Sequence, residues 1–279
     1  MITVFQSTRL LVVALLVTVL ASCACPFAVK PTPNDVVAGQ VTNRTYDFKE
    51  AGKPMSYALY VPSSYDGSQK MPLMILLHGL TSNPNAVIGY EGITQEAEKR
   101  GIIVVAPYGY NEGGWYGSRG KGKDFGDKTA NMFTKGAPEN LGELSELDVL
   151  NVFDIIQDEF RIDQDRMYVV GHSMGGAGTV HFGTKYHKQW AAIAMMSPAV
   201  FVDPPEPISN LKDIPVMIVH GDKDELVPVD LVREFYQRVS DTGTITKYME
   251  IPDGDHVKVI SRNPEMITEV FDFLTSYSN

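Results

Sequence analysis

The residues best suited to chemistry stand around Ser173, in the segment Gly171-His-Ser-Met-Gly175. An apolar run at 167–170 precedes it and predicts a buried strand, and small residues after it lead into a helix that runs to about Tyr186. A serine at such a strand-to-helix turn is pushed out from the edge of a sheet, and glycines flank it because a side chain there would crowd the turn. The pattern predicts a nucleophile elbow with Ser173 as the attacking group.

A serine hydroxyl needs a base within hydrogen-bond reach and an acid that orients the base. His256 is the best candidate for the base, because it follows the last predicted strand and precedes the last predicted helix. Asp222 and Asp224 both follow the strand that ends at Val219, and Asp224 is preferred because it lies further out on the turn. Asp222 stays the alternative. The predicted triad, in chain order, is Ser173, Asp224 and His256.

Acyl transfer also needs two N–H donors for the oxyanion of the tetrahedral intermediate. We expect one to be the backbone N–H of Met174, the residue after the nucleophile. The other is expected to be the backbone N–H of Leu80, because Gly79 before it allows the chain to approach closely.

A long stretch at 108–143 has seven glycines between Gly109 and Gly126 and no clear periodicity. A loop of this length in a compact domain usually has a function, and we expect it to wall the site. Its aromatic residues Tyr108 and Trp115 are candidates for stacking on the substrate. The alternative, of equal weight, is that they pin the loop to the domain.

Charge and motif content exclude several classes of partner. The net charge of −10 argues against nucleic acid, which requires a basic face. The chain has no histidine or cysteine spacing typical of a metal site, and no Gly-x-Gly-x-x-Gly opens its first helix. We therefore expect neither a metal nor a dinucleotide cofactor.

The elements that must position these residues alternate from residue 71 onward. Strands are predicted at 73–77, 102–106, 167–170, 191–196, 216–219 and 246–251. Helices are predicted at 93–100, from a capping box at Ser145 to about Phe160, after Ser173, at 229–239 and at 264–275. Two earlier strands, at 45–50 and 55–62, predict a hairpin. The fold class is therefore α/β, with a mostly parallel central sheet, helices on both faces, an N-terminal antiparallel hairpin and no large cap domain.

The N-terminus predicts export. An apolar run at 10–20 has the length of a signal peptide and is short for a membrane span. It ends in Leu20-Ala-Ser-Cys23, which resembles a bacterial lipobox, so residues 1–22 are expected to be a lipoprotein signal and Cys23 to carry lipid. The predicted location is the bacterial cell envelope, with this anchor as the only membrane contact. The alternative is a secreted protein cut near Ala24.

The remaining domain boundaries follow from this interpretation. Residues 23–44, which are rich in proline, are expected to be a flexible tether, and residues 45–279 a catalytic domain. Cys23 and Cys25 are the only cysteines, so the predicted domain has no internal disulfide.

Four segments carry a resemblance to a known family. They are Tyr57-Ala-Leu-Tyr-Val-Pro62, Met71-Pro-Leu-Met-Ile-Leu-Leu-His-Gly79, Gly171-His-Ser-Met-Gly175 and His220-Gly-Asp-Lys-Asp224. Over about residues 45–277 the chain resembles serine α/β-hydrolases. Within them it is similar to bacterial extracellular esterases related to polyhydroxybutyrate depolymerases, feruloyl esterases and prolyl-oligopeptidase-like esterases. Asp255, before the histidine, departs from the glycine that many such relatives carry.

The resemblance implies the α/β-hydrolase fold and hydrolysis of carboxylic esters through an acyl-enzyme, without a cofactor. The substrate would be a small-molecule or polymeric ester. Two alternatives stay open: a serine peptidase of the prolyl-oligopeptidase type, and a non-catalytic binding protein on the same scaffold. The lack of domain disulfides, which many polymer-degrading relatives have, weighs against a polymer.

Overall fold

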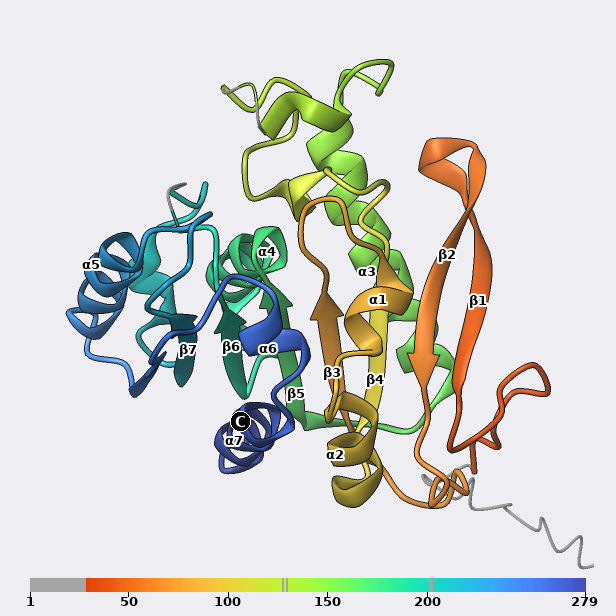
Figure 1. The fold of residues 1–279 in the computed structure, drawn as a ribbon. Coiled ribbons are helices and arrows are strands. Elements are labelled where there is room, and N and C mark those ends of the chain that lie inside the picture. Colours follow the sequence, from red (N-terminus) through yellow and green to blue (C-terminus); the bar gives the residue numbers. More distant parts are fainter. Residues whose placement is uncertain (1–28, 127, 129, 201–202) are drawn as a thin grey trace, which may run out of the picture.

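The computed structural model describes residues 29–126, 128, 130–200 and 203–279. One eight-stranded sheet lies at its centre, with the strand order β1-β2-β4-β3-β5-β6-β7-β8 (Figure 1). The strands are β1 (Val41–Phe48), β2 (Lys53–Tyr60), β3 (Met71–Leu77), β4 (Ile103–Pro107), β5 (Ile162–His172), β6 (Ala192–Met196), β7 (Val216–Gly221) and β8 (Thr246–Ile251). The helices are α1 (Pro84–Ile88), α2 (Ile93–Arg100), α3 (Leu141–Glu159), α4 (Met174–Lys185), α5 (Val229–Ser240), α6 (Lys258–Ser261) and α7 (Pro264–Thr275).

The predicted sheet type is confirmed. β1 pairs antiparallel with β2, and β2 with β4, while the other neighbours are parallel. From β3 the chain passes to β4 on one side and later returns to β5 on the other side. Where the connections from two neighbouring strands leave in opposite directions, a crevice opens at the carboxyl ends of those strands, and ligands bind there in open α/β sheets. The loop after β3 and the turn after β5 therefore border this crevice.

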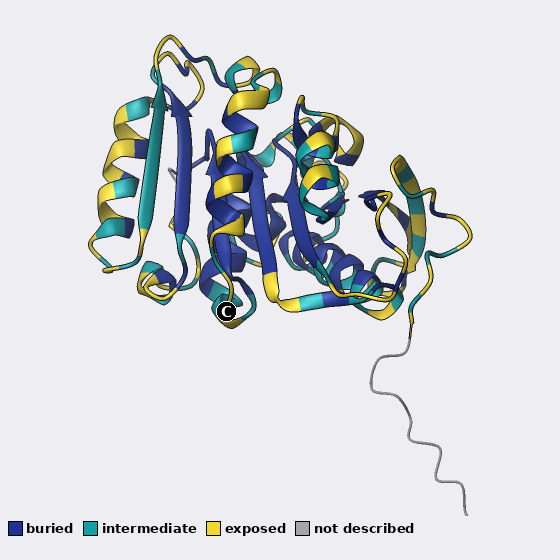
Figure 2. Cartoon of the chain, turned by 90° about the horizontal axis from the view of Figure 1, so that it is seen from below, coloured by how far each residue is buried: buried dark blue, intermediate teal, exposed yellow. Residues whose placement is uncertain are grey.

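Two hydrophobic layers enclose the sheet, and β3 shows how the sequence builds them. Leu73, Ile75 and Leu77 pack into the layer that contains residues of α3, α4 and α5, whereas Met74 and Leu76 pack into the layer with α1, α2 and α7. Successive side chains of a strand point to opposite faces, so a strand covered on both faces has to be apolar throughout. Figure 2 shows the buried strands between helices whose outer sides are exposed.

Several predicted boundaries are confirmed. β8, α2 and α7 have the expected ends. α2 ends at Gly101, which has φ 66° and ψ 42°, the left-handed conformation that glycine adopts at helix C-termini. The segment 197–215, between β6 and β7, contains only a 3₁₀ turn at Ile208–Leu211 among its described residues, in agreement with the predicted lack of a large cap domain.

The predicted start of α3 at a capping box is wrong. The helix begins at Leu141, so Ser145 and Asp148 lie within it, and both side chains are fully buried. Both side chains bind the loop that precedes the helix, and Asp148 also accepts from the Tyr46 hydroxyl of β1, so neither caps the N–H groups of α3. The local sequence pattern resembles a cap because both roles require the same residue types.

The predicted tether at 23–44 is also wrong for the residues that the structure describes. β1 begins at Val41, inside the proposed tether, and Val36 is buried. The Lys30 ammonium donates to the carbonyl of Gln157, at the end of α3, over 2.8 Å. The folded domain therefore includes residues well before 45, because this segment finds partners on the domain surface.

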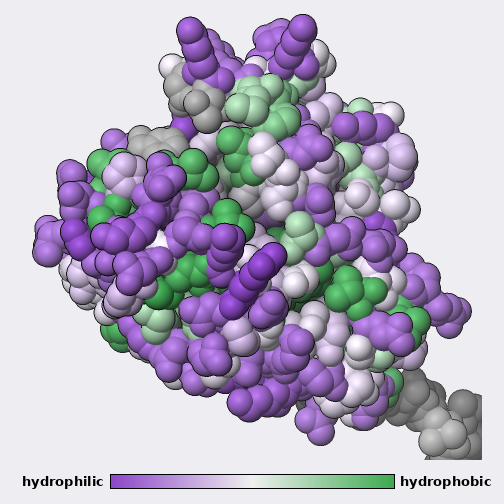
Figure 3. Space-filling view, in the orientation of Figure 1, coloured by the Kyte–Doolittle hydropathy of each residue, from purple (hydrophilic) through white to green (hydrophobic). Residues whose placement is uncertain are grey.

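The predicted signal segment 1–22 and Cys23 lie outside the described residues. Among the helices that the structure describes, none is both long enough and apolar enough to cross a membrane. The face shown in Figure 3 is hydrophilic over most of its area, with hydrophobic side chains grouped toward its middle.

Candidate active site

Ser173 occupies the turn between β5 and α4 in a strained conformation, with φ 56° and ψ −114°. Strain of this kind costs about 1–3 kcal/mol and persists only where the surroundings enforce it. A Cβ on Gly171 would lie 2.1 Å from the Gly175 carbonyl oxygen, and one on Gly175 would lie 2.2 Å from the carbonyl oxygen of Leu77. The two glycines are therefore required for the elbow, as the sequence predicts.

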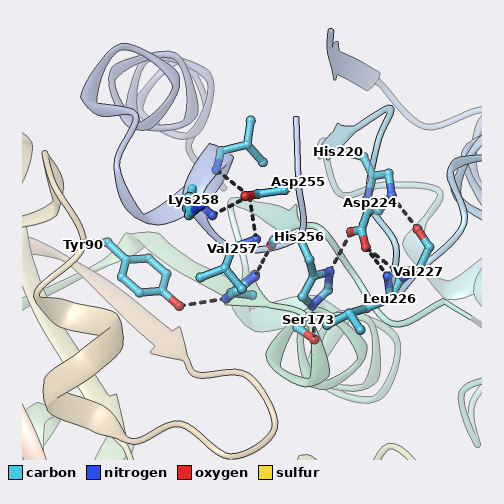
Figure 4. Close-up of polar contacts among 12 residues, drawn as sticks. Tyr90, Ser173, His220, Asp224, Leu226, Val227, Asp255, His256, Val257 and Lys258 are labelled. Carbon is cyan, nitrogen blue, oxygen red and sulfur yellow. Dashed lines mark hydrogen bonds and ion pairs between the residues drawn. The ribbon is translucent and has the colours of Figure 1, made fainter. Parts of the chain in front are cut away.

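Three side chains form one hydrogen-bonded series (Figure 4). The Nε2 atom of His256 lies 2.8 Å from the Ser173 hydroxyl, and its Nδ1 atom lies 2.6 Å from Oδ2 of Asp224. An ionised carboxylate only accepts hydrogen bonds, so Nδ1 carries the ring proton and Nε2 is left to accept the serine proton. The structure thus brings the predicted serine, acid and base together. Among the hydrogen bonds of the described residues, none joins Asp222, the alternative acid, to the histidine.

Asp224 is held as a carboxylate by its surroundings. Its other oxygen, Oδ1, accepts from the backbone N–H groups of Leu226 and Val227 over 2.9 and 2.8 Å. Burial raises the pKa of Asp224, but the hydrogen bonds from His256 and these two amides outweigh burial, and the pKa lies below its usual value. The negative charge that would stabilise a histidinium is therefore present at neutral pH.

A second histidine, beside the nucleophile, fixes the backbone of the first. The buried His172 ring has its Nε2 atom 2.9 Å from the carbonyl oxygen of His256 and its Nδ1 atom 2.8 Å from the Tyr90 hydroxyl. A carbonyl only accepts, so Nε2 carries the proton and Nδ1 accepts from Tyr90. Burial and the neighbouring His256 lower the pKa of His172 to about 4, so the ring is neutral.

Neither member of this pair could be assigned from the sequence. His172 lies inside the elbow and is a weaker candidate for the base than His256, and no local pattern distinguishes Tyr90, which lies in the loop between α1 and α2. The pairing depends on contact between residues 82 positions apart.

The two predicted oxyanion donors lie around Ser173. The N–H of Leu80 has no hydrogen-bond partner in the described part of the chain, and the N–H of Met174 is in the first turn of α4, where N–H groups lack partners within the helix. Both residues border the same cavity as Ser173. A Cβ on Gly79 would lie 3.3 Å from Cβ of Ser173, so glycine allows the loop to approach the nucleophile.

A cavity of about 570 Å³ opens beside Ser173. Its walls are largely apolar and include Leu80, Tyr90, Trp115, Met174, Ala199 and Val227. Trp115 is therefore in the predicted place. Tyr108 is not among the residues that line this cavity, so its assignment to substrate binding stays a prediction. Its side chain packs against the cluster of Phe48, Met55 and Leu144, on the side of the β1–β2 hairpin.

Hydrogen bonds from α3 anchor the loop that contains Trp115. The Ser145 hydroxyl accepts from the N–H of Tyr116 over 2.9 Å and donates to the Gly109 carbonyl over 2.6 Å. One oxygen of Asp148 lies 2.6 Å from the N–H of Gly109. These buried contacts hold Trp115 and Tyr116 in left-handed conformations, with φ 59° and 54°. The wall of the cavity is thus fixed before any ligand enters.

No group of three or more histidine, cysteine, aspartate or glutamate side chains among the described residues is arranged to hold a metal ion. The site offers the chemistry of its own side chains and amides. A strained serine, a hydrogen-bonded base and acid, and two free N–H groups are the parts that nucleophilic acyl transfer requires.

Comparison with known proteins agrees with this geometry. Residues 49–257 match the sequence model of a family, Esterase, whose description reads "Putative esterase". The chain belongs to this esterase family. The S-formylglutathione hydrolase of Bos taurus is 28% identical over 157 residues, which are 55% of this chain and 55% of that protein. The bifunctional acetylxylan esterase/xylanase XynS20E of Neocallimastix patriciarum is 27% identical over 197 residues, 70% of this chain and 25% of that protein. The chain thus spans about half or less of the length of these relatives.

Solved structures show the α/β-hydrolase fold. An S-formylglutathione hydrolase from Agrobacterium tumefaciens superposes with a TM-score of 0.67 at 16% identity, over 88% of this chain and 99% of that one. A ferulic acid esterase from Anaeromyces mucronatus, in complex with ferulic acid, gives a TM-score of 0.64 at 15% identity, over 91% of this chain and 96% of that one. The fold that the sequence resemblance implied is confirmed.

Proposed function

We propose that this member of the esterase family is a serine carboxylesterase that works through an acyl-enzyme. The observation that carries the proposal is the series Ser173–His256–Asp224, hydrogen-bonded at 2.8 and 2.6 Å beside a largely apolar cavity. In the first half-reaction His256 removes the Ser173 proton as the hydroxyl oxygen attacks the ester carbonyl carbon. The oxyanion is stabilised by the N–H groups of Leu80 and Met174.

The intermediate collapses when the bond to the leaving oxygen breaks and His256 donates its Nε2 proton to that oxygen. Asp224 stabilises the histidinium in the interval and keeps the Nδ1 proton in place. Water then enters, gives a proton to His256 and attacks the acyl carbon. Release of the acid returns the proton to Ser173, so the cycle consumes one ester and one water.

The cavity supports an apolar or aromatic acyl half. Its volume falls within the range of small-molecule sites, about 300–1,000 Å³, and its walls are largely apolar. The similar Anaeromyces mucronatus esterase holds ferulic acid, an aromatic acid, which motivates aryl esters as test substrates. Polymeric esters should be tested beside the aryl esters. The comparisons favour neither a peptidase nor a binding protein over this proposal.

Turnover of p-nitrophenyl butyrate by the wild type and by Ser173→Ala tests the proposal. We expect the variant to lose at least about 10⁴-fold in kcat, because the nucleophile and its base act as a unit. Labelling with a fluorophosphonate should mark Ser173 in the wild type only. Equal turnover by both proteins would refute the proposal, and an active enzyme without label on Ser173 would refute the assigned nucleophile.

We further propose that the protein is exported and held at a bacterial cell envelope by lipid on Cys23. The support is the sequence alone: an apolar run at 10–20 followed by Leu20-Ala-Ser-Cys23. Mass spectrometry of the mature N-terminus tests this proposal. A mature chain that begins at another residue, without lipid, would refute it and favour secretion.

A further inference from the structure

A second hollow adjoins the catalytic cavity on the far side of a low apolar ridge. Leu226 and Val257 form the ridge, and both are exposed, at 69% and 47%. They line the cavity beside Ser173 and also the second hollow, of about 620 Å³, as does His256. His256, whose ring bonds to Ser173, is therefore one of the residues that line both spaces. Exposed apolar groups that flank a cleft are typical of a ligand-binding groove.

The second hollow is lined by more positively than negatively charged side chains. Three cations line it, Lys223, Lys258 and Arg262, together with two carboxylates, Glu225 and Asp255. In a chain of net charge −10, a local excess of positive charge is unexpected. It indicates a place where an anionic group would be attracted.

One of the two carboxylates faces the protein backbone. Oδ1 of Asp255 accepts from the N–H groups of Val257, Lys258 and Val259, at 3.1, 2.6 and 3.2 Å (Figure 4). It thereby fixes the start of α6, which carries Lys258. Asp255 thus orients the wall of the hollow and is partly neutralised by these donors.

The three cations form no close ion pair with the carboxylates nearby, although the charge of Lys258 contributes to lowering the pKa of Asp255. Within the described ranges, no aspartate or glutamate oxygen forms an ion pair with their charged nitrogens. Elsewhere cations do find such partners: Arg233 pairs with Glu250, and Lys247 with Glu269, at 2.6 and 2.7 Å. The cations of the hollow are exposed and available to a ligand.

The mechanism determines which half of an ester can reach this hollow. The acyl carbonyl must face the N–H groups of Leu80 and Met174, which places the acyl half in the largely apolar cavity beside Ser173. The leaving oxygen must lie beside Nε2 of His256, because it takes its proton there. The leaving half therefore extends past His256, over the ridge, toward the second hollow.

We propose that the second hollow is a leaving-group subsite for esters whose alcohol half carries a carboxylate or a similar anion. This inference rests on the proposed esterase function and names its substrate class. The ester C–O bond breaks, the leaving oxygen takes the proton from His256, and the alcohol departs with its own anionic group still ionised. The anion contributes to binding through Lys223, Lys258 and Arg262 and takes no part in bond making.

A matched pair of substrates isolates this contact. The anion 4-acetoxybenzoate and its methyl ester have the same acetyl group and the same aryl leaving oxygen, and they differ in the charge at the far end of the leaving half. The quantity of interest is the ratio of their kcat/KM values, anion over methyl ester. Comparing this ratio between proteins cancels the different intrinsic reactivity of the two esters.

We expect the triple variant Lys223→Gln, Lys258→Gln, Arg262→Gln to lower this ratio about tenfold, since each exposed ion pair makes a small contribution. The control Lys70→Gln, which removes a charge just before β3 and outside the second hollow, should leave it unchanged. Mono-4-nitrophenyl succinate carries its carboxylate on the acyl half, so its kcat/KM should not show this fall in the triple variant. In the wild type the ratio should also fall between about 50 and 500 mM salt, which gives a readout independent of the variants.

A ratio that is the same in the wild type and the triple variant, or that is unaffected by salt, would overturn the subsite. An equal fall in kcat/KM for the succinate ester in the triple variant would also overturn the subsite, because the effect would then not depend on the leaving half. If the wild type cleaves p-nitrophenyl butyrate and shows no ratio change, only the subsite fails. If the wild type cleaves no ester and matches Ser173→Ala, the proposed function itself fails.

Discussion

Replacing Asp224 by asparagine should reverse the proton arrangement of His256. The two backbone N–H groups that point at Oδ1, from Leu226 and Val227, require an oxygen at that position. The amide NH₂ of the introduced side chain would then occupy the place of Oδ2, 2.6 Å from Nδ1 of His256, and would donate to it. The ring proton has to move to Nε2, which can no longer accept from Ser173. We expect kcat to fall about 10⁴-fold, the size of loss that a wrong tautomer causes in a triad.

The assay is turnover of p-nitrophenyl butyrate at neutral pH, with thermal unfolding as a check on folding. Asp222→Asn is the matched control: it makes the same chemical change two residues away, at a half-buried side chain not bonded to His256. It should stay within about threefold of the wild type, because it leaves the hydrogen bonds of the triad in place. Activity of Asp224→Asn within about tenfold of the wild type would refute the tautomer argument. Loss of activity in Asp222→Asn, with Asp224→Asn active, would move the acid to the alternative position.

Two further predictions concern His172. His172→Leu removes the hydrogen bond to the His256 carbonyl and should lower kcat by about 5- to 100-fold, since an unsatisfied buried acceptor costs about 1–3 kcal/mol. His172→Gln keeps a donor and should restore most of the activity, so equal kcat in both variants would contradict a positioning role. The second prediction is a loss of stability in acid. The pKa of His172 is lowered from 6.5 to about 4 in the folded protein, so folding favours the neutral ring. The free energy of unfolding is therefore highest above about pH 6.5, and it decreases as the pH falls from 6.5 toward 4. The loss is about 3 kcal/mol. The free energy of unfolding in urea should fall less between about pH 7 and pH 4.5 in His172→Gln than in the wild type. An identical fall in both proteins would contradict this prediction.

The central sheet could be predicted from the sequence because its signals are local. The apolar run of β3 follows from burial on both faces, and Gly101 marks the end of α2 by its conformation. The elbow could be recognised for the same reason, since Gly171 and Gly175 are each required by contacts of the turn and the strand beside it.

The errors lie where a side chain's partner is distant in sequence. Ser145 has the spacing of a helix cap, but its true partners, at Gly109 and Tyr116, are 36 and 29 residues away. Lys30 stands in a proline-rich stretch typical of a tether, although it binds a carbonyl at the end of α3. No property of these residues alone decides between the two outcomes.

The anchoring of the cavity wall on α3 has a consequence for how such enzymes diversify. The loop that contains Trp115 depends for part of its backbone hydrogen bonding on Ser145 and Asp148, which belong to a helix that follows it in the chain. Insertion, deletion or exchange of the loop alone would leave two polar helix side chains buried without these partners. The loop and α3 are therefore expected to change together in evolution. A single substitution at Trp115 would alter the cavity wall and leave the length of the loop and its contacts with α3 unchanged.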